Sequence, residues 1–178
     1  VGSFNGSLEV QSSAVYLDKI TGFDDIGGFV GQFYSGGSGN TLNITDSYIN
    51  FDDKGQHPGD NFNGSEGYQM GVLFGYVANG LTGEVKNVYM DTTKLAAIGN
   101  ADVNSSYGVG SISMNSTNLY MIDDTDTLPN QNGNIPTVVA KASDLPEDFR
   151  RGDNGSDWVE VGESLYLAWE ANIFNLTN

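Results

Sequence analysis

The only histidine of the chain, His57, is the first candidate for chemistry. It lies in the turn-like sequence Gln56-His57-Pro58-Gly59-Asp60, and the chain has no cysteine and no Gly-x-Ser-x-Gly motif. A serine triad would have to use this one histidine, and Cys nucleophiles and Cys/His zinc sites lack the residues they need. The sequence therefore predicts a non-catalytic protein in which His57 is a loop residue.

Paired carboxylates are the second candidate, because two Asp or Glu side chains can hydrolyse a glycosidic bond. Adjacent acids occur at Asp24-Asp25, at Asp52-Asp53 and at Asp123-Asp124-Asp126. Enzymes of this kind usually present basic side chains in the same groove, whereas the 7 Lys and Arg residues are scattered along the chain. A carbohydrate-active β-helix enzyme, or a carbohydrate-binding module, is therefore the alternative to a non-catalytic protein.

Calcium is the metal ion that best suits the acidic segments, since it binds carboxylate, amide and carbonyl oxygens. Two polar segments carry such donors, namely Asp60, Asn61, Asn63 and Glu66 in one and Asp123, Asp124 and Asp126 in the other. Both segments also have the composition of an ordinary solvated turn. Ca²⁺ is thus the one cofactor that we expect, and a solvated turn is the alternative for each cluster.

The tripeptide Arg151-Gly152-Asp153 has the sequence that integrins recognise. It precedes the turn-forming pair Asn154-Gly155, and a functional copy has to be exposed at a loop tip with both charges accessible. We treat these three residues as a candidate ligand-binding site.

Asn-x-Ser/Thr sequons, which accept N-linked glycans in secreted proteins, recur along the chain. Their asparagines are Asn5, Asn43, Asn63, Asn104, Asn115, Asn154 and Asn175. Asn, Ser and Gly also favour turns, so a turn-rich composition produces such triplets without any glycosylation. Both explanations stay open at this point.

The overall charge restricts the partners of the protein. With 7 basic and 23 acidic residues, the 178-residue chain has a net charge of −16. Such a surface repels nucleic-acid phosphates and anionic lipids, so we expect neither as a partner. The absence of cysteine suits an exported protein, and no apolar run is long enough for a membrane span.

A repeated cassette has to position these candidate residues. It consists of a Gly-bearing hydrophobic stretch, at 1–3, 28–31, 71–75 and 108–111, and a later strand centred on Tyr16, Tyr48, Tyr89 or Tyr120. Repeats of this size are typical of solenoids, in which each unit buries its apolar face against the next. The sequence thus predicts an all-β solenoid of four irregular rungs, and a β-sandwich with similar strands is the alternative.

Three parts follow along the chain. Residues 1–125 carry the cassettes, residues 126–142 form a polar linker, and residues 143–178 contain both tryptophans, Trp158 and Trp169. Large aromatics suit the closing of a β-core, so the last part is predicted to cap the repeats, with a helical turn after Ser143 and a strand over 165–169. The first cassette starts at Val1 without a cap, so we expect residue 1 to be a cut or processed end.

Two of the cassettes resemble the GLUG repeat of large bacterial and archaeal surface proteins. The resemblance lies in Gly28-Phe29-Val30-Gly31 with Ser47-Tyr48, and in Gly71-Val72-Leu73-Phe74-Gly75 with Asn87-Val88-Tyr89. It implies a right-handed β-solenoid (β-helix) in an extracellular, cell-surface protein similar to filamentous-haemagglutinin-like adhesins.

The resemblance implies an adhesin or a rigid stalk within a larger secreted or cell-surface protein. Its partners would be host-cell or environmental glycans or proteins, or neighbouring repeats of the same parent protein. A third possibility beside adhesin and enzyme is a self-assembling extracellular filament, in which open solenoid ends stack chain on chain.

Overall fold

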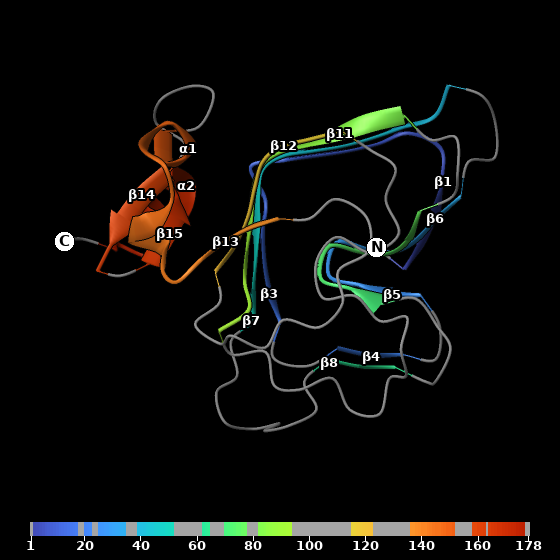
Figure 1. Ribbon diagram of the computed structural model, residues 1–178, viewed down its shortest axis with the longest axis horizontal. Coiled ribbons are helices and arrows are strands. Elements are labelled where there is room, and N and C mark those ends of the chain that lie inside the picture. The colour runs from blue at the N-terminus through green and yellow to red at the C-terminus, as the bar shows by residue number, and fades with distance from the viewer. Residues whose placement is uncertain are drawn as a thin grey trace.

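The computed structural model shows a mostly β protein with long stacks of parallel strands and a few short helices (Figure 1). It describes residues 2–17, 20–22, 25–34, 39–51, 62–64, 70–77, 82–93, 115–122, 136–151, 158–162 and 164–176. Within these ranges every strand pair is parallel except for one hairpin near the C-terminus. The predicted predominance of β-strands is therefore confirmed, whereas the short helices make the protein mostly β rather than all-β.

The largest sheet is built from the Tyr-centred strands of successive cassettes. Its strands are β2 (Leu8–Gln11), β3 (Ala14–Leu17), β7 (Thr41–Phe51), β11 (Thr82–Asp91), β12 (Asn115–Ile122) and β13 (Thr137–Val139). They follow the order β13-β12-β11-β7-β2, and β3 also pairs with β7. Tyr48, Tyr89 and Tyr120 are direct neighbours on β7, β11 and β12. β13 lies within the segment 126–142 that was predicted to be a linker.

The first cassette is out of step with this row of tyrosines. β3 pairs with β7 so that Ala14 lies beside Tyr48, whereas Tyr16 lies beside Asn50. Tyr16 is thus displaced by two residues from the position that the sequence spacing gives it. It lies on an edge strand with 46% of its surface exposed, and from there its hydroxyl reaches Tyr48 and Glu170.

The Gly-bearing stretches form a second stack of parallel strands. β1 (Ser3–Asn5), β6 (Val30–Tyr34) and β10 (Phe74–Val77) pair in the order β1-β6-β10. Two shorter pairs extend the pattern, β5 (Ile26–Gly27) with β9 (Met70–Gly71) and β4 (Ile20–Gly22) with β8 (Phe62–Gly64). β8 contains Asn63, one of the predicted calcium ligands.

Glycine is required where the strands of this second stack approach each other. A Cβ atom on Gly27 would lie 2.1 Å from the carbonyl oxygen of Val30 and 2.5 Å from the backbone nitrogen of Gly75. A Cβ atom on Gly75 would lie 2.5 Å from the carbonyl oxygen of Gly31. The close backbone approach explains why each cassette carries glycines beside its hydrophobic residues.

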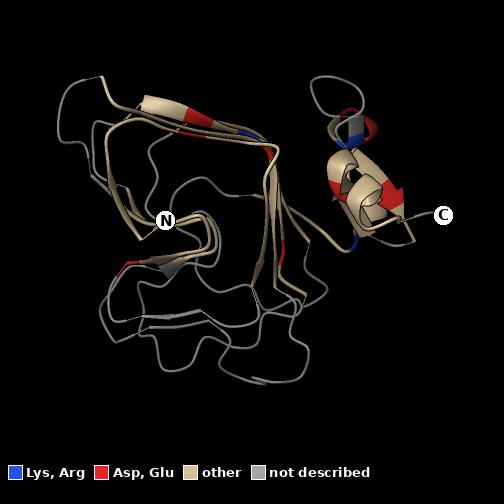
Figure 2. Ribbon diagram, turned by 180° about the vertical axis from the view of Figure 1, so that it is seen from behind, with Lys and Arg blue, Asp and Glu red and all other residues tan. Residues whose placement is uncertain are grey.

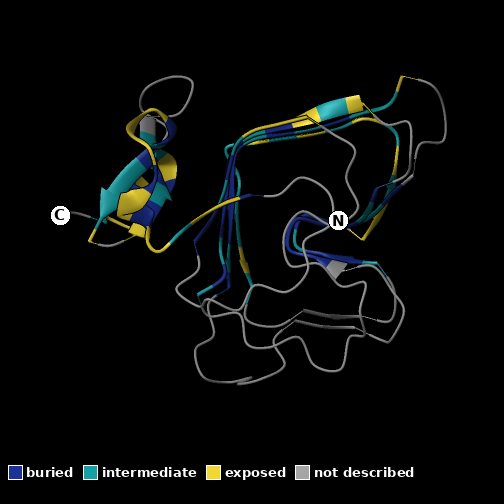
Figure 3. Cartoon of the chain, in the orientation of Figure 1, coloured by how far each residue is buried: buried dark blue, intermediate teal, exposed yellow. Residues whose placement is uncertain are grey.

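The main core lies between the two stacks. Val30 and Phe33 of β6, Phe74 of β10 and Ile44 and Ile49 of β7 are all fully buried there. Figure 3 shows the buried residues along the strands and the exposed ones mainly at the strand ends and in the C-terminal segment. The core therefore runs along the stack rather than within any single cassette, as the repeat pattern predicts.

The long strands of the large sheet turn a sharp corner, visible in Figure 1 where β7 and β11 change direction. At the corner Ser12, Asp46, Asn87 and Asn118 have φ values of 46°, 46°, 52° and 52°. Asn87 donates its side-chain amide to Asp46 Oδ1 at 3.0 Å, and Asn118 donates to Asn87 Oδ1 at 2.9 Å. Short polar side chains tolerate this left-handed backbone, and the ladder of amides pairs their buried polar groups.

The C-terminal segment packs across the outward face of the sheet beyond this corner. It comprises the 3₁₀ turn η1 (Ala142–Asp144), α1 (Glu147–Arg151), the antiparallel hairpin of β14 (Trp158–Val161) and β15 (Ser164–Leu167), and α2 (Ala168–Ile173). Phe149, Trp158 and Leu165 form a second hydrophobic cluster with Tyr48 and Tyr89. Strands β7 and β11 are thereby covered on both faces, as is usual for parallel sheets.

Two local predictions for this segment differ from the structure. The strand expected over 165–169 ends at Leu167, because Glu170 folds back to accept the backbone N–H of Leu167 at 2.9 Å and so starts α2. Ser143 lies inside η1 instead of capping a helix. Among the described residues, no helix is both long and apolar enough to cross a membrane.

Candidate functional site

The tyrosines of the large sheet form one row beneath the C-terminal segment. The rings of Tyr48 and Tyr89 are stacked, with centroids 4.8 Å apart and planes 7° apart. Trp158 lies across both rings, with centroids 6.0 Å from Tyr48 and 5.4 Å from Tyr89. Phe149 packs edge-on against Tyr120 at 4.9 Å. The rings of Tyr48 and Tyr89 are therefore used for packing and are buried, whereas Tyr16 of the first cassette stays exposed.

A buried carboxylate, Glu170, joins α2 to this row. Glu170 is 0% exposed and accepts hydrogen bonds from the hydroxyl of Tyr16 at 2.8 Å and from that of Tyr48 at 2.8 and 2.9 Å. The hydroxyls of Tyr16 and Tyr48 also contact each other, and the hydroxyl of Tyr89 donates to the carbonyl of Leu165. These bonds satisfy a charge that would otherwise be costly to bury.

Burial fixes the protonation state of these tyrosines. Desolvation raises the pKa of Tyr48 and of Tyr89 well above the usual value of 10.0, and neighbouring tyrosines and acids raise it further. Both hydroxyls are therefore protonated near neutral pH and act as hydrogen-bond donors. The network joins the C-terminal segment to the large sheet.

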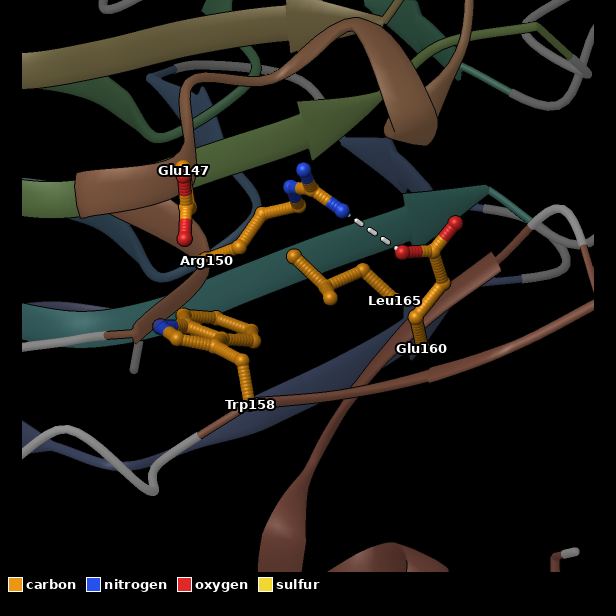
Figure 4. Close-up of a pocket in the computed structure, with 5 residues that line it drawn as sticks. All are labelled: Glu147, Arg150, Trp158, Glu160 and Leu165. Carbon is orange, nitrogen blue, oxygen red and sulfur yellow. Dashed lines mark hydrogen bonds and ion pairs between the residues drawn. The ribbon is translucent and has the colours of Figure 1, made fainter.

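The described part of the chain contains a pocket between α1 and the hairpin, which we call the α1–β14 pocket. It has a volume of about 270 Å³ and is lined by Glu147, Arg150, Trp158, Glu160 and Leu165. Figure 4 shows Glu147 and Arg150 entering from α1, with the Arg150 side chain extended toward Glu160 on β14. Two carboxylates, one guanidinium and one indole thus meet around one small space.

Electrostatics in the α1–β14 pocket are set by one ion pair. Nη1 of Arg150 lies 2.7 Å from Oε2 of Glu160, and the two side chains are 32% and 38% exposed. Figure 2 shows basic and acidic residues together on α1, whereas the described strands carry mainly acidic residues among their charged positions. The cation of Arg150 is therefore already paired with the carboxylate of Glu160.

Two hydrogen-bond donors at this pocket lack an acceptor. Nε of Arg150 and Nε1 of Trp158 are buried, and neither has a hydrogen-bond partner among the described residues. Such groups are uncommon in folded proteins. The Trp158 side chain is 7% exposed, and its ring packs against the rings of Tyr89 and Phe149.

Most of the metal-binding residues predicted from the sequence lie outside the described ranges. Asp60, Asn61, Glu66, Asp123, Asp124 and Asp126 lie outside the described residues, and Asn63 is in β8 without a described side chain. His57 and Asp52-Asp53 also lie outside them. Among the residues that are described, no group of three or more His, Cys, Asp or Glu side chains could hold a metal ion.

The remaining predicted sites fall partly within the described residues. Arg151 ends α1, and Gly152 and Asp153 lie outside the described residues. Of the sequon asparagines, Asn5, Asn115 and Asn175 are exposed. Asn43 is half-buried in β7 and its Oδ1 accepts the backbone N–H of Glu84 at 3.2 Å. Asn104 and Asn154 lie outside the described ranges, as does the side chain of Asn63.

Sequence reasoning missed both Glu170 and the α1–β14 pocket. The signal for Glu170 was its place three residues after Leu167, where an acid caps the start of a helix. No sequence signal brings Arg150 and Glu160 together, because their contact depends on how α1 packs against β14. Comparisons with family models, with curated proteins and with solved structures gave no significant match. The resemblance to GLUG repeats therefore stays a prediction.

Proposed function

We propose that this chain is a non-catalytic repeat domain of a larger secreted or cell-surface protein, acting as an adhesin or a rigid stalk. The observation that carries the proposal is the register of the strands. Tyr48, Tyr89 and Tyr120 are direct neighbours on three parallel strands. Two residues earlier on each of these strands, Asp46, Asn87 and Asn118 form a hydrogen-bonded ladder. Such columns link one repeat to the next and resist bending between them.

The finer architecture that we propose is a right-handed β-solenoid. Each of two cassettes supplies one strand to the second stack (β6 and β10) and one to the large sheet (β7 and β11), in the same order and register. An immunoglobulin-type sandwich is built from antiparallel sheets, so parallel pairing favours the solenoid. A crystal structure tests the proposal: a continuous right-handed coil through 28–91 is expected, and a left-handed or interrupted path would contradict it.

The adhesive role would depend on the surfaces that the stacked strands hold in fixed positions. Connections between the rungs of solenoids commonly carry the residues that bind partners, so we expect recognition to involve these connections and the C-terminal segment. The acidic charge of −16 excludes polyanions as favourable partners and leaves neutral glycans and proteins.

A glycan array probed with the intact chain tests the adhesive role. We run it with Ca²⁺ and again with a chelator, because the acidic turns are the predicted calcium ligands. Binding to a defined set of glycans supports an adhesin, and loss of that binding in chelator assigns calcium a part in it. No binding in either buffer contradicts the adhesin and leaves the stalk.

A carbohydrate-binding module is the second candidate function, and the α1–β14 pocket favours it. Glu147, Glu160 and Arg150 offer carboxylate and guanidinium groups around a space of about 270 Å³. An enzyme would release new reducing ends from a polysaccharide, whereas a binding module would retain the polysaccharide unchanged. A reducing-end assay on each glycan that binds separates the two, and turnover would contradict a non-catalytic domain.

A further inference from the structure

The strands β1, β2 and β3, which we call the first rung, have one open side. β1 pairs with β6, and β2 and β3 pair with β7, and none of the three has a second neighbour among the described residues. Such an edge can pair with a strand of another molecule, and proteins commonly block it with Lys or Pro. Residues 2–17 contain neither Lys nor Pro. A further strand can therefore add to this edge.

Burial shows that the core is incomplete at the first rung. Five of its apolar side chains are only half-buried, although each lies beside a fully buried residue of the next strand. These pairs are Phe4 with Phe33, Leu8 with Leu42, Val10 with Ile44, Val15 with Ile49, and Leu17 with Phe51. Residues in register on parallel strands face the same way, so the first-rung side chains point inward but are covered from one side only. One more layer of strands would complete their burial.

Further apolar surface adjoins the first rung. α2 lies beside it, because Nε1 of Trp169 donates to the carbonyl of Ser12 at 3.0 Å. Trp169 is itself exposed, as are Ile173 and Phe174 at the end of α2 and Tyr16 on β3. Large apolar side chains that gather on a surface mark an interaction site.

Charge favours a second copy of this chain as the occupant. Residues 1–17 carry one charged side chain, Glu9, although the whole chain has 7 basic and 23 acidic residues. Two copies repel each other across their acidic surfaces and therefore approach most easily through this weakly charged edge. A basic partner would be attracted to the acidic surfaces elsewhere on the molecule and would find a single carboxylate here.

The opposite end of the large sheet does not have this open core. On β12 the apolar residues Leu119, Met121 and Ile122 are all buried, and β13 pairs along this strand. A head-to-tail filament needs two open ends that fit each other. A single open end instead pairs with the same end of another copy about a twofold axis, and the assembly stops at two chains.

We propose that two copies of this chain dimerise head to head through their first rungs. The half-buried side chains of both copies then form one continuous core, which supplies the free energy of association. This inference is independent of the proposed adhesin or stalk function. If the chain does bind glycans, the dimer presents each binding surface twice and raises the avidity for a multivalent partner.

Sedimentation velocity of the intact chain tests the proposal. Between about 1 μM and about 1 mM the mass should rise from the 19.0 kDa of one chain to twice that value and stop there. Added NaCl should strengthen the dimer, because salt screens the repulsion between two acidic chains. A single-chain mass at every concentration would overturn the proposal. A mass that grows beyond two chains would contradict the twofold arrangement, and a dimer weakened by salt would contradict an apolar interface.

Hydrogen-exchange mass spectrometry locates the interface on the unmodified chain. As the concentration rises, the backbone amides of residues 2–17 should gain protection, whereas those of β12 should not change. A dimer that forms without added protection at 2–17 would use another surface, and the proposal would fail.

A pair of matched variants gives an independent test. Val10→Asp places a carboxylate in the proposed interface, and we expect the dimer to dissociate at a roughly tenfold higher concentration, because burying this charge is costly. Val138→Asp adds the same charge to an exposed position of β13, at the opposite edge of the sheet, and should leave the dimer unchanged. Equal effects of the two variants would contradict the proposal. If Val10→Asp fails to fold, as judged by circular dichroism, the exchange experiment decides.

Discussion

The strand stacks and the C-terminal segment are built on different rules. In the stacks the strands pair in parallel and like residues lie in rows. Tyr48, Tyr89 and Tyr120, for example, occupy the same position on neighbouring strands. The C-terminal segment has one antiparallel hairpin, short helices and a buried carboxylate at Glu170. Repetition gives an extendable framework, whereas the unrepeated segment has side-chain combinations that occur once and can be specific for a ligand.

The contact between the two regions is itself instructive. Trp158 and Phe149 come from the unrepeated segment, but they pack on a row of tyrosines that the repeats supply. The repeats thus present a regular aromatic surface, and the C-terminal segment packs against that surface. Changes in the stack should therefore affect the whole fold, while changes at the contact should affect mainly the docking of the segment.

The largest effect is expected from adding one methyl group where the strands of the second stack approach most closely. Gly27→Ala places a Cβ atom 2.1 Å from the carbonyl oxygen of Val30, and backbone atoms on both sides prevent relief. We expect the free energy of unfolding to fall by more than about 3 kcal/mol, measured by urea denaturation. Gly2→Ala is the control, because a Cβ atom there meets nothing within 4 Å. Equal stability of the two variants would show that the stacking is looser than described.

The corner ladder should give the next largest effect. Asn87→Ala removes hydrogen bonds of 3.0 Å to Asp46 and 2.9 Å from Asn118, and it leaves alanine at a φ of 52°. A loss of about 2–3 kcal/mol is expected in the same denaturation experiment. Asn175→Ala has a similar φ of 50° but lies exposed near the C-terminus, so it should cost less than about 1 kcal/mol. If Asn175→Ala lowered the free energy of unfolding as much as Asn87→Ala, the ladder would not be a source of stability.

A smaller loss is expected where the two regions meet. Glu170→Gln weakens the bonds from the hydroxyls of Tyr16 and Tyr48 and should cost about 2 kcal/mol. In hydrogen-exchange mass spectrometry the loss of protection should be confined to 158–176, and β7 and β11 should stay protected. Loss of protection spread evenly over the whole chain would mean that stack and segment do not behave as separate units.

Raising the pH above 10 should have the smallest effect, measured as the change in the free energy of unfolding per pH unit. The buried tyrosines decide whether this change is a gain or a loss of stability. The pKa of Tyr89 in the folded chain is raised well above 10.0, so above pH 10 the unfolded chain loses this proton first. Stability is therefore fully present below pH 10 and falls above it, by about 1.4 kcal/mol per pH unit for this residue. Tyr89→Phe should have a shallower decline between pH 10 and 11 in urea denaturation. The same slope in both proteins would contradict the burial of Tyr89.

How much the sequence predicted differs between the same two regions. The spacing of Tyr48, Tyr89 and Tyr120 was sufficient to predict neighbouring strands, because each cassette meets the same packing requirement. It was insufficient for Tyr16, where pairing between β3 and β7 places Ala14 in the tyrosine position. An edge strand has a neighbour on one side only, so the spacing of the repeat constrains its register less.

The candidate site was less accessible to prediction than the fold. Sequence patterns pointed to acidic turns and to the tripeptide at 151–153, which read as local motifs. Arg150 contacts Glu160 in the α1–β14 pocket, and the hydroxyl of Tyr48 donates to Glu170. Both are tertiary contacts, which the spacing of residues along the chain does not predict. Local chemistry is visible in a single sequence, whereas a site made by packing an unrepeated segment on a repeated one is not.

The parallel register of the stack is the central claim, and engineered cysteines test it directly. Thr45 lies beside Lys86 on β7 and β11, and the chain has no cysteine of its own. Neighbouring strands are about 4.8 Å apart, which is within the range of a disulfide. Thr45→Cys with Lys86→Cys should oxidise to an intramolecular disulfide, seen as a mass loss of about 2 Da per molecule, the two hydrogens released when a disulfide forms. Thr45→Cys with Glu84→Cys, two residues out of register, should stay reduced. A crosslink in the second pair and none in the first would contradict the account.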